Sequence, residues 1–467
     1  MNLYALLRSR FPADRSSPCM LLPDGSEVSY GALEVGVGRL AALLVEKGVG
    51  VGDRVAAQTA KSPEALMLYL AALATGAVFL PLNPAYTAAE VGYFLKDAEP
   101  ALFVTDAVAL SREADRLRPR TAIHDAAPGD LAALVYTSGT TGRAKGAMLS
   151  HHNLAANALA LQSAWGFTGD DVLLHALPIF HVHGLFVAIH CALLSGAPML
   201  WLDRFEEDAV LAALPRATVM MGVPTFYSRL LADRRFTAEA AAHMRLFISG
   251  SAPLLESAFD AFEARTGKRI LERYGMSEAQ MITTNPLHGE RLAGSVGFPL
   301  PGVAVRIAGG EPVGVVEIAG PSVTAGYWRN AEKTAQAFTE DGFFITGDIG
   351  RLDTDGRLWL SGRANDLIIS GGLNVYPKEI ELVLDDLPGV TESAVIGVAH
   401  PDFGEAVVAV IAGSGDEAAV IRAARERLAA FKAPKRVVFV DDLPRNAMGK
   451  VEKAALRRAY AGLFDVG

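Results

Sequence analysis

Short apolar runs alternate with longer apolar or amphipathic stretches through the first half of the chain. The run RVAAQTA, which begins at Arg54, is followed by Ser62-Pro63-Glu64, by ALMLYLAALATG and then by the short run AVFLPLN. Serine, proline and glutamate in this order are typical of a helix start, and Gly76 is well placed to end that helix. The pattern strand, helix, strand predicts parallel strands joined by crossover helices.

The same pattern recurs further along the chain. One helix is expected from Thr225, after the run ATVMMGVP, and another through ESAFDAFEARTG, between the runs MRLFISG and RILERYG. Each expected strand ends where glycine or polar residues cluster. Since open α/β sheets bind ligands beyond the carboxyl ends of their strands, these ends form a candidate binding site.

The stretch from Val172 to Leu202 contains no Asp, Glu, Lys or Arg. It does contain two prolines, two glycines and four histidines, which an unbroken lipid-facing helix would tolerate badly. We therefore expect a buried strand, a turn, a buried helix and a further strand here, and no membrane span.

The pattern changes in the last third of the chain. From about Val303, short runs separated by turns such as DTDG indicate a β-rich subdomain, and from about Asp366 a third region carries the amphipathic helix EAAVIRAARERLAAF. A chain of 467 residues is expected to form at least two domains. The predicted fold class is α/β: a large amino-terminal domain of parallel sheets with crossover helices and a β-rich subdomain, and a small α+β carboxyl-terminal domain.

Composition excludes several classes of function. Hydrophobic residues make up 51% of the chain and the net charge is −9, which argues for a compact soluble protein and against nucleic acid as a partner. Cys19 and Cys191 are too few for a disulfide framework, so two core thiols in a reducing compartment are expected. The amino terminus, MNLYALLRSRF, lacks the apolar region of a signal peptide, and the cytoplasm is the expected location.

A glycine-rich loop follows the apolar run LAALVY, in the stretch YTSGTTGRAKGAMLSHHN that begins at Tyr136. Backbone amides and hydroxyls at a strand end can cradle phosphate oxygens, and Lys145 adds a positive charge. This is not a Walker loop, because Lys145 stands three residues after Gly142 and is followed by Gly146 instead of Ser or Thr. A flexible surface turn would have the same glycine content.

Further motifs accompany this loop in a fixed order over nearly the whole chain. They are LPIFHVHGL, ISGSAPL, ERYGMSE, the run from FFITGDIG to NVYPKEIE, and LPRNAMGK. Together with YTSGTTGRAKG they resemble the motifs of the adenylate-forming superfamily of acyl-CoA synthetases, adenylation domains and luciferases. The stretches GVPTFY, MRLFISGSAPLL and FVDDLPRNAMGK, with ERYGM, are most similar to malonyl-CoA synthetases.

The resemblance implies an ATP-dependent ligation of malonate, or of methylmalonate, to coenzyme A. The acid would first react with MgATP to give an acyl-adenylate and pyrophosphate, and the thiol of coenzyme A would then displace AMP. It also implies an amino-terminal domain over residues 1–363 and a mobile lid over residues 366–467, with a hinge near Asn365. The implied cofactors are ATP, Mg²⁺ and coenzyme A as a co-substrate.

The resemblance assigns the phosphates to the glycine-rich loop. The residues implied there are Thr137, Ser138, Gly139, Thr140, Thr141 and Lys145. Glu278 is implied as the Mg²⁺ ligand, since this hard cation prefers carboxylate oxygen. Ser277 stands where relatives have threonine, and it keeps the hydroxyl that would contact phosphate.

Other residues are implied around the rest of the nucleotide. Asp348 can accept hydrogen bonds from both ribose hydroxyls, Arg363 can donate to the same sugar, and Tyr274 offers a flat face to adenine. Lys450 is implied to reach the α-phosphate and the attacking carboxylate together. The remaining residues implied at the nucleotide or the pantetheine channel are Ser251, Ala252, Pro253, Gly275, Met276, Gly371 and Gly372.

Two residues bear on the acid that is activated. His181 matches the family's gating histidine beside the acyl pocket, whereas His183 is expected to be structural. Arg273 precedes Tyr274 at a strand end, where a permanently charged guanidinium is costly unless an anion pairs with it. A second carboxylate on the substrate is the expected partner, as in malonyl-CoA synthetases, and an ion pair with Glu272 is the alternative.

Three other functions are compatible with the same motifs. They are a CoA synthetase for another short-chain acid, an adenylation enzyme that loads a carrier protein, and a nucleotide-binding protein without catalysis. Glu278 and Lys450 argue against the last of these. For the ligation of malonate, the expected partners are the small molecules malonate, ATP and coenzyme A, with no nucleic acid and no membrane.

Overall fold

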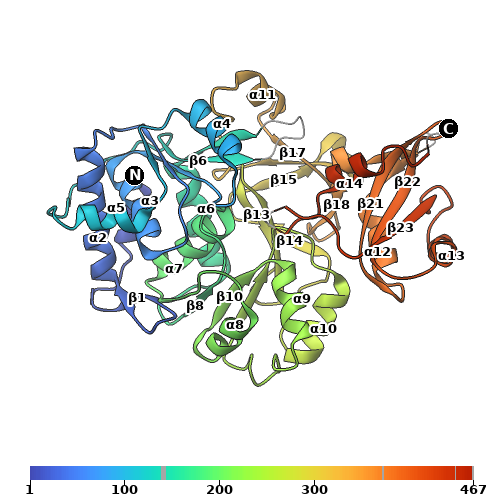
Figure 1. Cartoon of the computed structure of the whole chain (residues 1–467), viewed down its shortest axis with the longest axis horizontal. Helices are drawn as coiled ribbons and strands as arrows, with labels where there is room; N and C mark the ends of the chain where they lie inside the picture. The colour runs from blue at the N-terminus through green and yellow to red at the C-terminus, as the bar shows by residue number, and fades with distance from the viewer. Residues whose placement is uncertain (138–143, 371–372, 447–448, 465–467) are drawn as a thin grey trace. The chain divides into compact units, whose positions relative to one another are not determined.

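The computed structural model describes residues 1–137, 144–370, 373–446 and 449–464 (Figure 1). The chain divides into two compact units, each made of two segments. The first unit comprises Met1–Val305 and Ile318–Phe344, and the second comprises Arg306–Glu317 and Ile345–Gly467.

The first unit contains a five-stranded sheet in the order β5-β3-β4-β6-β7. Its strands are β3 (Arg54–Ala57), β4 (Val78–Pro81), β5 (Leu102–Val104), β6 (Leu131–Thr137) and β7 (Lys145–Ser150). The pairs β3–β4, β3–β5 and β4–β6 are parallel, and only β6–β7 is antiparallel among these described strands. The parallel pairing of β3 with β4 confirms the crossover predicted from the sequence.

A larger sheet in the first unit has the strand order β14-β13-β12-β11-β10-β8-β9-β1-β2. Its strands are β1 (Pro18–Leu21), β2 (Glu27–Ser29), β8 (Leu173–His175), β9 (Met199–Trp201), β10 (Val219–Gly222), β11 (Leu246–Ser249), β12 (Leu271–Met276), β13 (Gln280–Thr284) and β14 (Ser295–Pro299). The strands from β1 through β9, β8, β10 and β11 to β12 are parallel, whereas β13 and β14 continue antiparallel.

Helices fill the space between these two sheets and cover their outer faces. The helices of this unit are α1 (Leu3–Arg8), α2 (Tyr30–Glu46), α3 (Pro63–Thr75), α4 (Ala88–Ala98), α5 (Ala107–Ala114), α6 (His151–Ala164), η1 (His183–Ala188), α7 (Ile189–Ser195), α8 (Glu207–Ala213), η2 (Leu214–Arg216), α9 (Pro224–Ala232), α10 (Glu256–Thr266) and α11 (Ala331–Gln336). One apolar core joins both sheets to α3, α6 and α7, while α4 packs on the far face of the small sheet and α8 to α10 on the far face of the large one.

Both ends of helix α3 lie where the sequence signals predict them. Ser62 caps it by accepting a hydrogen bond from the backbone of Ala65, Pro63 occupies its first turn, and Gly76 ends it in the left-handed conformation at φ 79°. Every residue from Ala65 to Thr75 is buried, so the helix is apolar all round.

The charge-free stretch folds as expected into β8, a buried helix and β9. The helix differs from the expectation in one respect, because its first part, η1, is a π-helix that continues directly into α7.

Cys19 and Cys191 are free and fully buried, as predicted. Within the described ranges, we find no helix with both the length and the apolar character needed to cross a bilayer.

The second unit contains two further groups of strands. The first group, in the order β15-β16-β17-β18, is β15 (Ala304–Ile307), β16 (Gly314–Ala319), β17 (Phe344–Leu352) and β18 (Leu358–Arg363). The second group is β19 (Ile368–Ser370), β20 (Leu373–Val375), β21 (Val390–His400), β22 (Gly404–Gly413) and β23 (Arg436–Val440). This strand-rich region after Val303 confirms the predicted β-rich subdomain.

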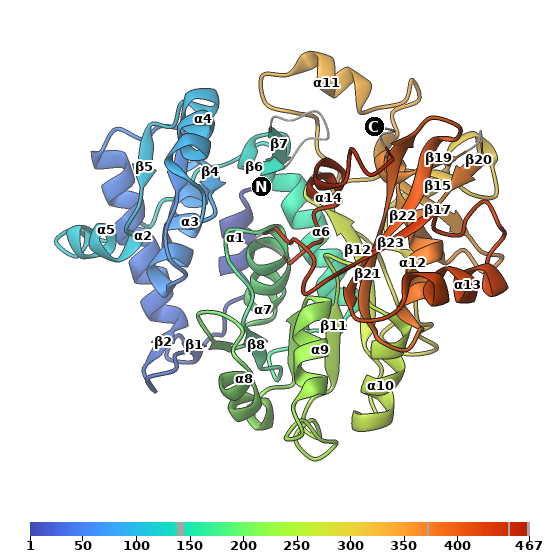
Figure 2. The ribbon, with the colours of Figure 1, turned by 45° about the vertical axis from the view of Figure 1, so that its right-hand side comes forward.

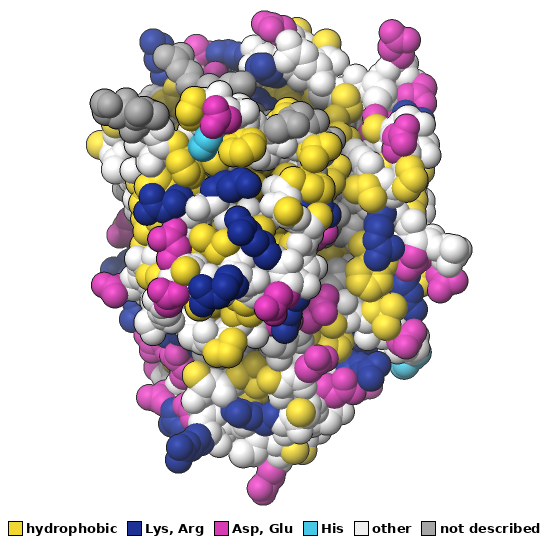
Figure 3. All heavy atoms as spheres, turned by 90° about the vertical axis from the view of Figure 1, so that its right-hand side faces the viewer, with side chains coloured by type: hydrophobic (Ala, Val, Ile, Leu, Met, Phe, Trp, Pro, Cys, Tyr) yellow, Lys and Arg dark blue, Asp and Glu magenta, His cyan; other side chains and the backbone are white. Residues whose placement is uncertain are grey.

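The sheet built on the long β21–β22 hairpin has helices on both faces (Figure 2). The helical elements of this unit are η3 (Ala308–Gly310), η4 (Ala364–Asp366), α12 (Pro377–Asp385), α13 (Glu417–Arg427) and α14 (Lys453–Ala459). Alternate residues of both strands face two separate apolar clusters, one with α12 and α13 and the other with α14. On the face shown in Figure 3, acidic and basic side chains are interspersed.

Candidate active site

The two stems of the glycine-rich loop lie opposite each other on β6 and β7. Thr137 is the last residue of β6, Lys145 is the first of β7, and the two are register partners. On α4, the hydroxyl of Tyr93 donates a 2.9 Å hydrogen bond to the carbonyl of Ala144, so this helix holds the second stem. The predicted phosphate contacts of the loop itself, Ser138, Gly139, Thr140 and Thr141, lie outside the described residues.

Glu278 lies in the turn between β12 and β13 and is only 7% exposed. Its Oε1 accepts hydrogen bonds from Oγ1 of Thr137 at 3.1 Å and from the hydroxyl of Tyr327 at 3.2 Å. The ammonium nitrogen of Lys145 lies 4.4 Å from the centroid of the Tyr327 ring. Burial and the charge of Glu278 raise the pKa of Tyr327. The fold therefore brings three predicted residues, Thr137, Lys145 and Glu278, together around Tyr327.

The donor set at Glu278 fits a magnesium ion. A carboxylate beside hydroxyl oxygens supplies the hard ligands that Mg²⁺ prefers. Among the described residues, no group of three or more His, Cys, Asp or Glu side chains could enclose a metal ion by itself. An ion held by Glu278 would take its other ligands from water and from substrate oxygens, as Mg²⁺ commonly does.

The backbone around Glu278 is tightly constrained. The register of β12 and β13 shifts between Tyr274 and Gly275, and a Cβ on Gly275 would lie 2.0 Å from the carbonyl oxygen of Gln280. The carbonyl of Glu278 accepts a 2.7 Å hydrogen bond from the backbone of Thr324. Only glycine fits at position 275, and the turn that carries Ser277 and Glu278, directly after Met276 at the end of β12, is fixed from both sides.

Ser251 begins the loop after β11 with a φ of 72°, a left-handed conformation that is uncommon for residues other than glycine. Its hydroxyl oxygen lies 3.3 Å from Nδ1 of His183. Ala252 is half-buried and Pro253 exposed in the same loop, and Tyr274, on the neighbouring strand β12, is 7% exposed. Backbone strain of this kind is found where a binding site imposes it.

Arg273 directs its guanidinium into the interior of the first unit. The residue is 3% exposed, and a Cβ on Gly250 would lie 2.4 Å from its Cζ, so this glycine makes room for the side chain. Within the described ranges, Nε and Nη2 of Arg273 are buried and have no hydrogen-bond partner. Burial lowers the pKa of Arg273 to about 9. Among the described residues, no anion bonds to these two nitrogens to offset the desolvation of the guanidinium.

Glu272 does not support the alternative of an ion pair with Arg273. Successive residues of a strand point to opposite faces, so the two side chains diverge from β12. The Oε1 of Glu272 instead accepts a 3.3 Å hydrogen bond from the backbone of Gly294.

His183 lies beside this cation. It is 3% exposed, and in the described part of the chain its Nε2 is buried without a hydrogen-bond partner. Burial, with a further contribution from the charge of Arg273, lowers the pKa of His183 well below its usual range, so the ring is neutral. His181, two residues earlier, is half-buried, and its ring centroid lies 6.1 Å from that of Phe180.

In the second unit, Asp348 and Arg363 are register partners on β17 and β18. Nε of Arg363 lies 2.8 Å from Oδ1 of Asp348, which is 5% exposed. The two residues predicted to share one ribose are therefore side by side. Asn365, at the predicted hinge, lies in η4, and its neighbour Asp366 accepts a 2.8 Å hydrogen bond from Arg457.

Lys450 is an exposed residue whose backbone bonds to Asn446. The backbone N–H of Asn446 donates to the carbonyl of Lys450 at 2.9 Å, and the N–H of Lys450 donates to Oδ1 of Asn446 at 3.1 Å. Arg445 also donates to the carbonyl of Gly449 at 2.8 Å. The predicted channel residues Gly371 and Gly372 lie outside the described part of the chain.

Two residues of this site were not found from the sequence. Tyr327 lies 49 positions after Glu278, and no motif marked it. His183 was expected to be structural, although its place two residues after His181 in a charge-free run was a signal of a polar site. Its contact with Ser251 and its proximity to Arg273 appear only in the folded chain.

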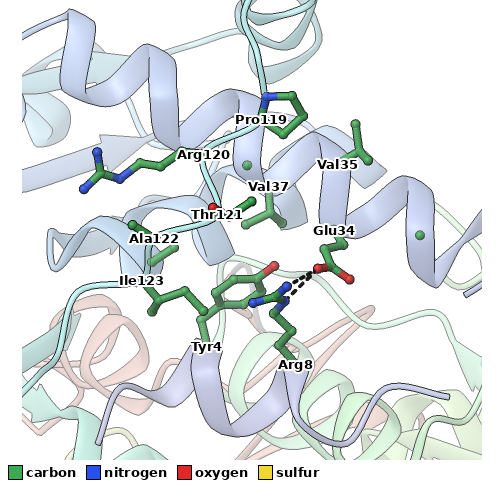
Figure 4. Close-up of a pocket in the computed structure, with 13 residues that line it drawn as sticks. Tyr4, Arg8, Glu34, Val35, Val37, Pro119, Arg120, Thr121, Ala122 and Ile123 are labelled. Atoms are coloured by element: carbon green, nitrogen blue, oxygen red, sulfur yellow. Dashed lines mark hydrogen bonds and ion pairs between the residues drawn. The ribbon is translucent and has the colours of Figure 1, made fainter. Parts of the chain in front are cut away.

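A hollow elsewhere in the first unit takes no part in this site. It is bordered by α1, α2 and the segment around Pro119 to Ile123, with the Arg8–Glu34 ion pair on one side (Figure 4). None of the predicted site residues lines it.

Two family models match the chain. The model described as AMP-binding enzyme matches residues 9–328, and the model described as AMP-binding enzyme C-terminal domain matches residues 379–450. The chain belongs to the AMP-binding enzyme family, the adenylate-forming superfamily that includes the acyl-CoA synthetases.

Several named proteins are similar to the chain. MatB from Rhodopseudomonas palustris, solved with ATP bound, is 48% identical, has a TM-score of 0.97 and covers 99% of each chain. A malonate–CoA ligase from Arabidopsis thaliana is 38% identical over 71% of this chain and 61% of its own length. A sulfoacetate–CoA ligase from Cupriavidus necator is 35% identical over 97% of both. The chain thus spans about three fifths of the Arabidopsis relative and nearly all of the other two.

Proposed function

We propose that this enzyme ligates malonate to coenzyme A at the expense of ATP, with methylmalonate as the alternative dicarboxylate. The observation that carries the proposal is Arg273, a buried guanidinium whose Nε and Nη2 have no partner within the described ranges. A free carboxylate at the far end of the substrate would supply the missing anion and accept from both nitrogens. The similarity to a named malonate–CoA ligase supports the same assignment.

His183 extends this anion site. Its neutral ring has a buried Nε2 without a partner in the described chain, and its other nitrogen faces the Ser251 hydroxyl. If that hydroxyl donates to Nδ1, then Nε2 carries the proton and is a second donor for the same carboxylate. A substrate without a distal anion would leave both Arg273 and His183 desolvated and unpaired, which disfavours acetate and fatty acids.

In the first half-reaction, an oxygen of the reacting carboxylate attacks the α-phosphorus of ATP. The bond from this phosphorus to the bridging oxygen of pyrophosphate breaks, and an acyl-adenylate forms. Thr137 and Lys145 are proposed to hold the departing phosphates, with the loop residues between them, because two anions must be neutralised before they can meet. A Mg²⁺ ion held by Glu278 would supply further neutralisation of the phosphate oxygens.

In the second half-reaction, the thiol of coenzyme A attacks the carbonyl carbon of the adenylate and AMP leaves. His181 is proposed to border the path of the thiol, and Asp348 and Arg363 to hold the ribose. Tyr274 and the loop Ser251-Ala252-Pro253 would line the adenine. Lys450 is proposed to act only in the first half-reaction, with residues 366–467 turning as a lid about Asn365 between the two halves.

The test is a pyrophosphate-release assay with a panel of acids, with and without coenzyme A. Malonate, methylmalonate, sulfoacetate, acetate and ferulate form a sufficient panel, since they separate dianions from monoanions. We expect turnover with malonate or methylmalonate that requires coenzyme A for multiple cycles. Equal use of acetate or ferulate would overturn the dicarboxylate assignment.

Sulfoacetate is the second candidate, because Arg273 can pair with a sulfonate as well as with a carboxylate. The relative named for that acid supports including sulfoacetate in the panel.

An enzyme that loads a carrier protein instead of coenzyme A would release pyrophosphate but form no free thioester. The cytoplasm, where ATP and coenzyme A are present and thiols stay reduced, is the proposed location.

A further inference from the structure

Lys61, just before α3, is held by three acceptors. Its Nζ lies 2.8 Å from Nδ1 of His175 and 2.9 Å from the carbonyl oxygen of the same residue, and it also donates to the carbonyl of Leu202. The ammonium sits 4.7 Å from the centroid of the Trp201 ring. Burial lowers the pKa of Lys61 well below its usual range, and the charge of Asp203 opposes this shift. Three acceptors match the three protons of the ammonium form. Lys61 is thus held in one position by its partners and is not a solvated surface lysine.

The geometry fixes the tautomer of His175, the last residue of β8. Its Nε2 lies 3.1 Å from the carbonyl oxygen of Gly184, and a carbonyl only accepts, so Nε2 carries the proton. Nδ1 is then the lone-pair nitrogen that accepts from Lys61. The ring is 1% exposed and stacks on Trp201, with centroids 5.1 Å apart. Burial, with the charge of Lys61, lowers the pKa of His175 well below its usual range, which keeps the ring neutral.

The carbonyl of Gly184 belongs to the wide turn that starts η1. It accepts the backbone N–H of Ile189, five residues later, as well as the Nε2–H of His175. Gly184 has no room for a side chain, since a Cβ there would lie 2.0 Å from the carbonyl oxygen of Pro178. π-helices are rare, occur mostly as single turns inside α-helices, and are frequently found at functional sites. The side chains next to this turn are His181 and His183.

We propose that Lys61 and His175 are positioning residues for the acyl site. Lys61 holds His175 in the Nε2–H tautomer, and His175 holds the Gly184 carbonyl in the π-turn that sets the places of His181 and His183. The inference rests on the proposed function, because these histidines matter only if they border the reacting acid. In the described chain, the hydrogen bonds and ring contacts of Lys61 and His175 involve no residue assigned to the nucleotide.

Two substitutions at His175 separate positioning from simple packing. In His175→Gln the amide nitrogen reaches the place of Nε2 and can still donate to Gly184. In His175→Asn the shorter amide reaches only the place of Nδ1, so it can still meet Lys61 but leaves the Gly184 carbonyl without its side-chain donor. Both variants replace the ring by an uncharged amide, which makes them a matched pair.

We expect His175→Asn to lower kcat on the order of 10- to 100-fold, because small displacements of groups at a reacting centre have effects of this size. His175→Gln should stay within about fivefold of the wild type by the same reasoning, and the KM for ATP should be unchanged in both. The assay uses the acid that the wild-type enzyme activates best. The test of His175 is therefore independent of whether malonate is the correct substrate. Equal losses in the two variants, or no loss in His175→Asn, would refute the role.

A spectroscopic measurement tests the tautomer without any substrate. In the full-length protein labelled with ¹⁵N-histidine, the resonance absent from His175→Gln identifies His175 at pH 7. We expect a protonated Nε2 and an accepting Nδ1 in the wild type, and a shift of the Nδ1 signal in Lys61→Met. A protonated Nδ1 in the wild type, or an unchanged signal in Lys61→Met, would overturn the assignment whatever the enzyme's substrate is.

Discussion

The hydroxyl of Thr137 donates a 3.1 Å hydrogen bond to the carboxylate of Glu278, a residue 141 positions further along the chain. Thr137 ends β6 at the first stem of the glycine-rich loop, and Glu278 sits in the turn between β12 and β13. The bond therefore links the loop of one sheet to a turn of the other. Any change at Glu278 acts on both the carboxylate and the stem of the loop.

Glu278→Gln separates these two effects. The amide oxygen of glutamine can still accept from Thr137 and Tyr327, whereas the negative charge is lost. We expect adenylate formation to fall on the order of 100-fold and the Mg²⁺ concentration for half-maximal rate to rise, because a neutral amide is a weaker ligand for this cation. Pyrophosphate release across a Mg²⁺ titration measures both quantities. Tyr327→Phe, which removes one hydroxyl and no charge, is the control and should lose only a few-fold; equal losses would argue against a metal at Glu278.

Arg273→Met should make the protein less active and more stable. Replacing a buried charge whose Nε and Nη2 lack partners in the described chain by an apolar side chain of similar volume is expected to stabilise the fold by about 1–4 kcal/mol. Loss of the pair with the distal carboxylate costs about 2–5 kcal/mol, so kcat/KM for malonate should fall tens- to thousands-fold. Denaturant unfolding and pyrophosphate release provide the two readouts. Arg269→Met, at an exposed arginine paired with Glu263, should change malonate turnover by less than about twofold.

Lys450→Ala is expected to affect one half-reaction only. Adenylation should fall by orders of magnitude, on the order of 10²-fold or more, since a positive charge is lost where charge develops in the transition state. Thioester formation from a supplied acyl-adenylate should be spared. The two half-reactions are assayed separately on the same preparation. A similar loss in both would assign Lys450 to binding or to folding instead.

His151 predicts a specific dependence of stability on pH. Burial lowers its pKa from 6.5 to about 4, and its Nδ1 accepts a 3.1 Å hydrogen bond from the backbone of Leu3. Between these two pKa values the unfolded chain binds more protons than the folded chain, so stability is complete above pH 6.5 and falls as the pH falls toward 4. The contribution is about 2–4 kcal/mol.

His151→Asn keeps an acceptor for Leu3 and removes the titration. The free energy of unfolding of this variant should change less between pH 7 and pH 4.5 than that of the wild type. Denaturant unfolding at several pH values measures the difference. An unchanged pH dependence would show that His151 is not among the groups that destabilise the fold in acid.

The elements that could be predicted from the sequence are those whose signals are local. Ser62, Pro63 and Gly76 mark both ends of α3 by cap chemistry alone, and the runs around it are short enough to be strands. The π-turn at Gly184 could not be predicted, because residues 182–194 are all buried and show no period that distinguishes one helix type from another. The bond that selects the wide turn comes from His175, on a different element.

The residues of the candidate site also fall into two groups, those marked by a local sequence signal and those whose contacts depend on the folded chain. Thr137, Lys145 and Glu278 lie in motifs with recognisable chemistry, and the structure brings them together. Tyr327 could not be found, since its contact with Glu278 depends on how a distant loop returns to the sheet. The position of Arg273 at a strand end indicated a site residue in the sequence. Only the structure shows that its Nε and Nη2 lack partners in the described chain.

The apolar clusters on the two faces of the β21–β22 hairpin draw all of their described members from residues 368–464. A genetic crossover between Arg363 and Ile368 would therefore transfer this interior whole, without leaving half a core on either parent. Enzymes with different acid preferences can inherit one another's carboxyl-terminal segments as cassettes, and new specificities can arise in the remainder of the chain while this segment is kept.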